Sequence, residues 1–364
     1  MSRIQKRPLM RIVVAVSVIY WLASLSPLGM EAASRAKRKP GPEAQKLLDR
    51  IRSAPGILLG YSTTNDRSLP VFEKACGKKM AVLEYELAEG YRTEVLKRGR
   101  GKGGNDDPGA AEAWAKKPGT AVMFRWHMRH PETNHFRKGN IEDVLPGGKH
   151  HKALLKKLDY LVERIKRLKG PVIVRPWHEG NGNWFWWNGK PKEFKQLWRL
   201  TVEYVEGKGR NNVLWCYSPN ATADDSWQVD KFYPGDEYVD IAAIDYYFDV
   251  SKTGGHIQNL DALMKSVRAL EAVIPKDMPM GFGEIGPRGP RPREQVSEET
   301  DKQWAEFWKN LEPDMRKHLP RFKFFLVWST IAFEKKLYPT SGIALEGLRD
   351  FADSKGVITL GEKW

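Results

Sequence analysis

One stretch decides the fold class of this chain: Val172-Ile-Val-Arg-Pro-Trp-His-Glu-Gly-Asn-Gly-Asn-Trp-Phe-Trp-Trp187. It begins with a short apolar run, which is typical of a buried β-strand. The strand leads directly into the polar pair His178-Glu179 and then into a loop rich in aromatic residues. A polar pair at the end of an apolar strand is typical of parallel sheets, whose functional residues lie where the strands end.

Seven more apolar runs of this kind occur along the chain. They span residues 57–60, 80–85, 121–126, 213–217, 239–245, 278–283 and 322–328. Stretches with apolar residues at helical spacing lie between them, at residues 152–168, 194–205, 257–273 and 304–319. Apolar strands that alternate with helices indicate a parallel sheet covered by helices, and a count of eight favours a closed barrel. We therefore predict an α/β fold, a (β/α)8 TIM barrel that forms a single domain.

The N-terminal region has the pattern of an export signal. It has a basic start, an apolar run over residues 12–28 and the small residues Ala32, Ala33 and Ser34. We predict a cleaved signal peptide over residues 1–34, with an uncleaved membrane anchor as the alternative. A linker is expected over residues 35–43 and the barrel domain over residues 44–364. The expected location is secreted, periplasmic or at the cell envelope.

Composition limits the classes of function. The net charge is +15, but the Lys and Arg residues are spread along the chain, which favours a solvated surface over a nucleic-acid or polyanion site. The 14 Trp residues favour carbohydrate binding, because indole rings suit the apolar faces of sugars as well as protein cores. Cys76 and Cys216 lie far apart in apolar contexts, so a disulfide and two buried thiols both remain possible.

Functional residues of such a barrel lie at the carboxyl ends of its strands. This criterion selects His127, His178, Glu179, residues 218–220, Tyr246, Tyr247, Glu284 and Trp328. Two carboxylates, two imidazoles and several aromatic rings are therefore predicted to converge on one rim of the barrel.

Glu179 and Glu284 are the candidates for acid and base chemistry. Cleavage of a glycosidic bond needs one protonated carboxyl and one ionised carboxylate. The aromatic residues after Glu179 would lower the local dielectric constant and raise its pKa, as a general acid requires. The alternative for Glu179 is a surface residue beside a packed Trp cluster. Glu284 lies between glycines at the end of an apolar strand, and its alternative is a structural carboxylate bonded to Arg175.

The histidines and tryptophans have more than one interpretation. His127 and His178 lack a third ligand at zinc-site spacing, so we expect hydrogen bonds to sugar hydroxyls or to the carboxylates, and no metal. Of the five tryptophans on the third and fourth strands and the loop that follows, at least two are expected to be core residues. These are Trp126, Trp177, Trp184, Trp186 and Trp187. For Trp328, core packing and substrate contact remain equally open. Ser218 lacks the pattern of a nucleophile elbow.

These motifs resemble glycoside hydrolase family 26, best known for endo-β-1,4-mannanases. The most specific match is Arg175-Pro-Trp-His-Glu179 with the aromatic loop that follows it. Further matches are Arg125-Trp-His127, Leu145-Pro-Gly-Gly148, residues 233–240 leading to Asp245-Tyr-Tyr247, and Gly283-Glu-Ile-Gly286. The similarity extends from residue 56 to residue 328. It departs at Gly180, where family members often have Met, and at residues 98–104, which follow no pattern that we can place.

The resemblance implies a retaining endo-hydrolase of β-1,4-mannan with Glu179 as acid/base and Glu284 as nucleophile. It implies that a central subsite is lined by His127, His178, Trp184, Tyr247 and Trp328. Tyr247 is expected to donate to Glu284 and to keep it ionised. The family also contains β-1,3-xylanases and mixed-linkage β-glucanases, and a catalytically inactive carbohydrate-binding protein is a further alternative. We expect no cofactor, no nucleic-acid partner and a monomer.

Overall fold

The computed structural model describes residues 38–63, 68–87, 108–221, 228–249, 255–288, 297–329 and 342–364. Residues 37–364 form one compact unit, and the description concerns this unit. The predicted signal peptide and residues 98–104 lie outside the described residues. Among the helices that are described, none is both long enough and apolar enough to cross a membrane.

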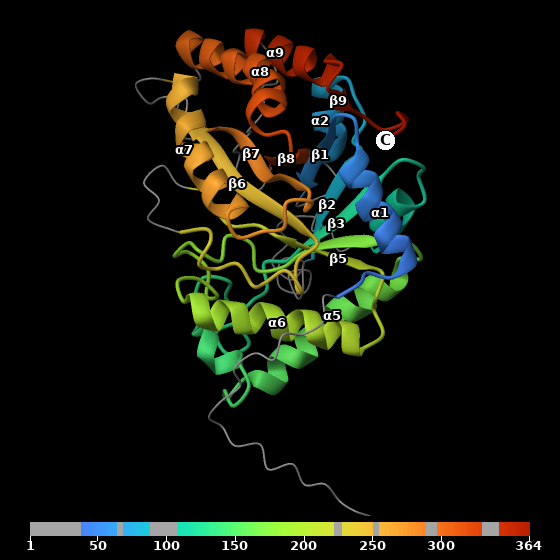
Figure 1. Ribbon diagram of the computed structural model, residues 1–364, viewed down its shortest axis with the longest axis vertical. Coiled ribbons are helices and arrows are strands. Elements are labelled where there is room, and N and C mark those ends of the chain that lie inside the picture. Colours follow the sequence, from blue (N-terminus) through green and yellow to red (C-terminus); the bar gives the residue numbers. More distant parts are fainter. Residues whose placement is uncertain are drawn as a thin grey trace, which may run out of the picture. The chain divides into compact units, whose positions relative to one another are not determined.

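Eight parallel strands form a closed barrel (Figure 1). The strands are β1 Ile57–Thr63, β2 Val82–Glu86, β3 Ala121–Arg125, β4 Val172–Arg175, β5 Val213–Tyr217, β6 Ile241–Asp249, β7 Met280–Arg288 and β8 Phe322–Ser329. Each strand pairs with the next, and β1 pairs with both β8 and β2, which closes the ring. A short strand, β9 (Val357–Ile358), adds to β1. The predicted (β/α)8 barrel is confirmed.

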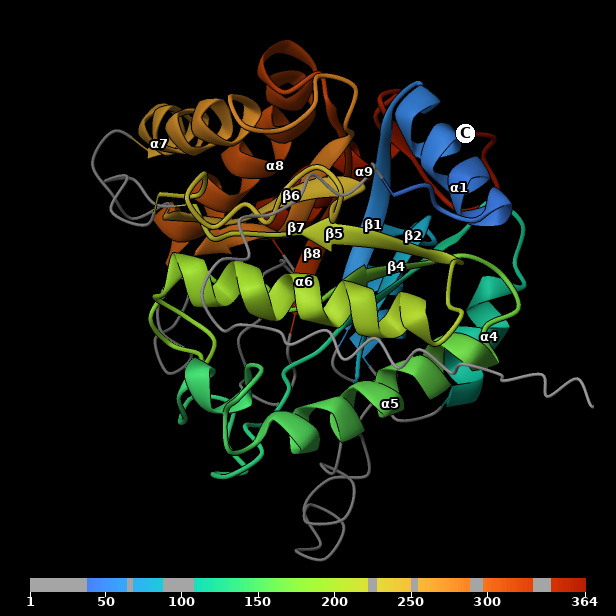
Figure 2. The ribbon, with the colours of Figure 1, turned by 60° about the horizontal axis from the view of Figure 1, so that its bottom comes forward.

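Helices surround the barrel between consecutive strands (Figure 2). They are α2 Ser68–Cys76, α4 Pro108–Ala115, α5 His151–Arg167, α6 Pro191–Gly207, α7 Gly255–Glu271, α8 Glu298–His318 and α9 Gly342–Asp353. The apolar faces of these helices pack with alternate strand residues, such as Leu59 and Val174, into one large core. Because the other strand residues face the barrel interior, both faces of each strand are apolar, as the continuous apolar runs predicted.

A further helix, α1 (Pro42–Ser53), packs against the amino-terminal end of the barrel. Its residues Ala44, Leu47, Leu48 and Ile51 form a second core with strand residues that face the barrel interior. Arg38 also lies at this end, where it pairs with Asp240 and Glu206.

The barrel interior changes from apolar to charged along the strands. In β4, Ile173 belongs to the apolar layer and Arg175 follows it on the same face. The strand register then places three charged residues, Glu86, Arg125 and Arg175, side by side on β2, β3 and β4. These three charged side chains lie at the last residues of their strands, toward the carboxyl end of the barrel.

Candidate active site

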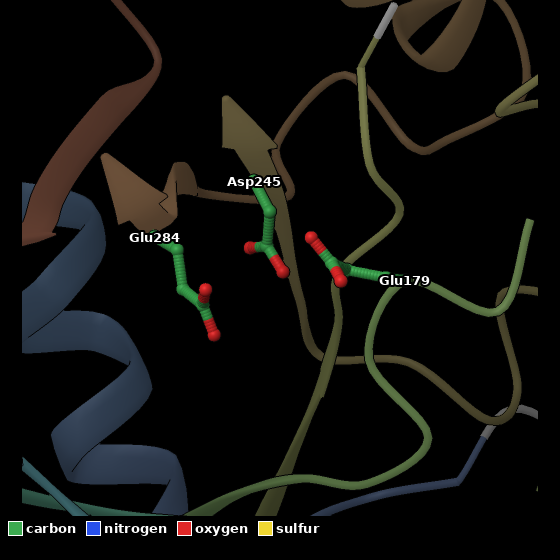
Figure 3. Close-up of side chains that lie close together, drawn as sticks. All are labelled: Glu179, Asp245 and Glu284. Carbon is green, nitrogen blue, oxygen red and sulfur yellow. The ribbon is translucent and has the colours of Figure 1, made fainter. Parts of the chain in front are cut away.

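The backbone after β4 turns sharply at Glu179. Both Trp177 and Glu179 have positive φ angles, 50° and 52°, which non-glycine residues rarely adopt. The turn is held by the backbone N–H of Glu179, which donates to Ser218 O at 2.7 Å, and by Asn188 Nδ2, which donates to Glu179 O at 2.7 Å. In this conformation the Glu179 carboxyl points toward Asp245 and Glu284 (Figure 3).

The Glu179 carboxyl is buried and has two neutral hydrogen-bond donors. Trp184 Nε1 donates to Oε2 at 2.7 Å and Asn220 Nδ2 donates to Oε1 at 2.6 Å, while 8% of the residue is exposed. Burial and the nearby charge of Glu284 outweigh these hydrogen bonds and raise the pKa of Glu179 to about 7. Glu179 can therefore carry a proton at neutral pH.

Glu284, on β7, has cationic partners. Arg125 Nη1 and Arg175 Nη2 both donate to Oε1, at 2.6 and 3.0 Å, and the Tyr247 hydroxyl donates to Oε2 at 2.5 Å. Burial alone would raise the pKa of this carboxyl, but the two guanidinium charges and the tyrosine hold it below its ordinary value. The predicted hydrogen bond from Tyr247 is confirmed. The alternative interpretation of Glu284 was a structural carboxylate bonded to Arg175. The structure contains this bond, but it lies in the candidate active site, where it helps to keep Glu284 ionised.

Asp245 is a third carboxyl between the other two (Figure 3). It is fully buried on β6, where Ser218 Oγ donates to Oδ1 at 2.5 Å and Arg175 Nη1 donates to Oδ2 at 2.9 Å. Burial and the nearby carboxylates Glu284 and Glu179 raise the pKa of Asp245 well above its usual range, against the charge of Arg175. The sequence placed Asp245 at a strand end but gave no sign that it faces this site.

Two further carboxylates, Glu84 and Glu86 on β2, support the arginines. Glu84 accepts from Arg175 Nε and Nη2 at 2.7 and 3.0 Å, and from Ser62 Oγ at 2.5 Å. Glu86 accepts from Arg125 Nε at 2.8 Å. The sequence analysis missed both residues, although two acidic residues separated by one position in an apolar strand share a face and are costly to bury unless paired.

The five residues predicted to line the central subsite lie around these carboxyls. His127 contacts His178 edge to face, with ring centroids 4.6 Å apart, and Trp184 contacts Glu179. Trp328, on β8, lies with its ring centroid 6.2 Å from that of Tyr247. The structure thus brings all five predicted positions together, while their contact with substrate stays a prediction.

The remaining tryptophans are core residues. Trp126, Trp177, Trp186 and Trp187 are buried, which confirms that at least two of the set are structural. Trp187 has its Nε1 bonded to His178 O at 3.0 Å, so it supports the residue next to Glu179. Both cysteines are buried free thiols.

Glu179, Asp245 and Glu284 also have the arrangement of a possible cation site. One oxygen from each carboxyl lies within 4.8 Å of one from each of the others. However, every carboxyl oxygen of the three already accepts from a protein donor, and two of the donors are guanidinium groups. The protein itself therefore balances the charge, and the set fits acid and base chemistry better than metal binding.

Comparison with known proteins identifies relatives that include two mannan endo-1,4-β-mannosidases. The chain is 25% identical to a mannan endo-1,4-β-mannosidase of Bifidobacterium adolescentis, over 88% of this chain and 35% of that protein. It is 33% identical to a mannan endo-1,4-β-mannosidase of Bacillus subtilis, over 44% of this chain and 43% of that protein. The chain therefore spans less than half the length of these two relatives.

Solved structures share the fold. A family 26 β-mannanase of Bacteroides ovatus superposes with a TM-score of 0.71 at 24% identity, over 89% of this chain and 96% of that chain. Residues 44–335, which include both catalytic candidates, match the sequence model of glycosyl hydrolase family 26. The chain therefore belongs to glycosyl hydrolase family 26.

Proposed function

We propose that this protein is an endo-acting β-1,4-mannanase that cleaves its substrate with retention of configuration. The observation that carries the proposal is the pair Glu179 and Glu284, two carboxyls with pKa values shifted in opposite directions at one barrel rim. Such a pair provides a proton donor and an ionised nucleophile at the same pH. The relatives named as mannan endo-1,4-β-mannosidases support mannan as the substrate.

The mechanism follows from the surroundings of each carboxyl. Glu179 protonates the departing glycosidic oxygen while Glu284 attacks the anomeric carbon and forms a glycosyl ester. The ionised Glu179 then takes a proton from water, which attacks the anomeric carbon and releases Glu284. Retention requires carboxyl groups about 5–5.5 Å apart, against about 6.5–9.5 Å for inversion. One oxygen of Glu179 lies within 4.8 Å of one oxygen of Glu284, which places both carboxyls within reach of one glycosidic bond.

The test is product analysis on purified polysaccharides. We expect reducing ends and short oligosaccharides from mannan and glucomannan, with the β-anomer formed first in proton NMR spectra. Glu284→Ala and Glu179→Ala should each lower kcat by about a thousandfold or more. Initial formation of the α-anomer would refute the retaining mechanism.

The same product analysis, extended to other polysaccharides, distinguishes the alternative substrates and roles. Release of sugar from β-1,3-xylan or mixed-linkage glucan, but not from mannan, would assign another polymer. Mannan binding with product formation that neither glutamate variant changes would show that these glutamates are not the catalytic pair. Binding without any product would instead favour a carbohydrate-binding protein.

We also propose that the protein acts outside the cytoplasm as a monomer. The support for export is the basic and apolar pattern of residues 1–34. Mass spectrometry of protein expressed in a secreting host, with a mature N-terminus near residue 35, would support cleavage. A full-length chain in the membrane fraction would support the anchor, and light scattering would give the oligomeric state.

A further inference from the structure

Glu86 contacts two residues of the site, His127 and Arg125. Its Oε1 accepts from the backbone N–H of His127 at 2.8 Å and lies 2.9 Å from His127 Nδ1. Its Oε2 accepts from Arg125 Nε at 2.8 Å. One buried carboxylate therefore contacts both a predicted sugar-binding residue and an arginine that holds Glu284.

These contacts determine which nitrogen of His127 carries the proton. Burial would raise the pKa of Glu86, but the charge of His127 when it is protonated, the charge of Arg125 and the hydrogen bonds from His127 lower it to about 2. When His127 is neutral, the Arg125 guanidinium still donates to Glu86 at 2.8 Å and favours the carboxylate, and an ionised carboxylate only accepts hydrogen bonds. The hydrogen between Oε1 and Nδ1 consequently belongs to Nδ1 of His127.

The other nitrogen, Nε2, is then the free one in neutral His127. No described residue hydrogen bonds to it, and 29% of the His127 side chain is exposed, against 11% for Glu86. The ring is also fixed in orientation by edge-to-face contacts with His178 and Phe185, whose centroids lie 4.6 and 5.3 Å from its own. A neutral imidazole held in this way offers a lone pair at Nε2.

We propose that Glu86 is a positioning residue that holds His127 as the Nδ1–H tautomer, so that Nε2 accepts a hydrogen bond from a hydroxyl of the bound sugar. The sugar contact rests on the proposed function, whereas the tautomer does not. Through Arg125, the same carboxylate also steadies Glu284. Glu86 thus links substrate binding and the nucleophile through one buried side chain.

The tautomer can be measured without substrate. In long-range proton–nitrogen NMR spectra of histidine-labelled protein, the signals of His127 are assigned by their loss in His127→Gln. At a pH where the ring is neutral, the wild-type spectrum should show the pattern of protonated Nδ1 and bare Nε2. Glu86→Gln should change this pattern to that of mixed tautomers. A wild-type His127 with protonated Nε2, or a pattern unchanged in Glu86→Gln, would overturn the proposal.

Glu84→Gln is the matched control, because Glu84 is a buried β2 carboxylate that contacts Arg175 and has no contact with His127. It should leave the His127 pattern as in the wild type. In kinetics on mannooligosaccharides, Glu86→Gln should lower kcat/KM about ten- to hundredfold. Its effect on KM should disappear when His127 is already Gln, whereas an equal effect in that background would exclude action through His127. Failure to hydrolyse mannan with the tautomer intact would refute only the proposed function.

Discussion

Glu179 and Glu284 are the same side chain in opposite electrostatic surroundings. Both are buried, so desolvation disfavours the charged form of each. Only Glu284 receives hydrogen bonds from two guanidinium groups, whereas Glu179 receives its hydrogen bonds from an indole and an amide. The difference in partners therefore assigns the proton to Glu179 and the charge to Glu284.

The pH dependence of activity should follow from this assignment. Activity requires protonated Glu179, whose pKa is about 7, and ionised Glu284, whose pKa is held below that of an ordinary glutamate by Arg125 and Arg175. We expect kcat/KM to fall tenfold per pH unit well above pH 7, as Glu179 loses its proton, and to fall on the acid side only at a pH below the ordinary pKa of a glutamate, as Glu284 gains one. Initial rates from pH 3 to 10 measure both limbs. Full activity at pH 9 would contradict the assigned proton donor.

Tyr247→Phe tests the hydroxyl that donates to Glu284. Its loss removes one of the groups that lower the pKa of Glu284, so the acid limb of the pH profile should move to higher pH. We expect kcat/KM at the optimum to fall about ten- to hundredfold. Tyr246→Phe, at the adjacent residue, is the control, because the Tyr246 ring packs against Phe248 in the large core between the barrel and the surrounding helices. Equal losses in both variants would argue against a role for the Tyr247 hydroxyl in the site.

At the scale of elements, the turn after β4 depends on packing against α6. A side chain at Gly180 would place its Cβ 2.0 Å from the ring of Phe194, which is fully buried on α6. Phe194 in turn packs with Phe232, at 5.6 Å between ring centroids. Family members often have Met at the position of Gly180. In this protein Phe194 of α6 occupies the space that a side chain at residue 180 would need.

Gly180→Ala should therefore destabilise the protein and disturb Glu179. Because the ring of Phe194 is fully buried and packs against Phe232, we expect a loss of about 1–3 kcal/mol in the free energy of unfolding, with reduced kcat. Denaturant unfolding and initial rates measure the two effects. Phe194→Leu in the Gly180→Ala background should restore part of the stability. An alanine variant as stable as the wild type would show that the space is not limiting.

At the scale of the whole molecule, the barrel separates stability from chemistry. The charged layer that holds the carboxyls lies at the carboxyl end of the strands, and α1 packs against the apolar interior at the other end. Trp364 packs against this second core. Its ring also lies against Arg50 of α1, with 4.1 Å between the guanidinium carbon and the ring centroid. Changes at this end should therefore affect unfolding more than catalysis.

Leu48→Ala tests this separation. Leu48 is a buried residue of α1, so the substitution leaves a cavity and should cost about 2–5 kcal/mol in the free energy of unfolding. We expect kcat and KM at 25 °C to stay within about twofold of the wild type. Lys46→Ala, whose parent side chain is 71% exposed on the same helix, should change stability by less than about 0.5 kcal/mol. A large loss of kcat in folded Leu48→Ala would show coupling between the two ends.

The sequence by itself determined the barrel and the two glutamates. Strands buried on both faces must be apolar throughout, so β4 and β5 could be located to the residue, and a charged side chain at such a strand end is conspicuous. The strands β6 and β7 extend further than their apolar runs, to Asp249 and Arg288, because the two strands stay paired with each other at the rim. Helices α1, α2, α4 and α9 were not predicted.

Only the tertiary structure decided how the glutamates differ. Arg125 and Glu284 are 159 residues apart, and their hydrogen bond depends on barrel closure, which no local pattern encodes. Asp245 faces the site beside an irregularity in the β6–β7 pairing, and Glu84 and Glu86 acquire their partners from other strands. The strength of a buried charge's interactions depends on distance and burial, and both are properties of the packed barrel rather than of neighbours along the chain.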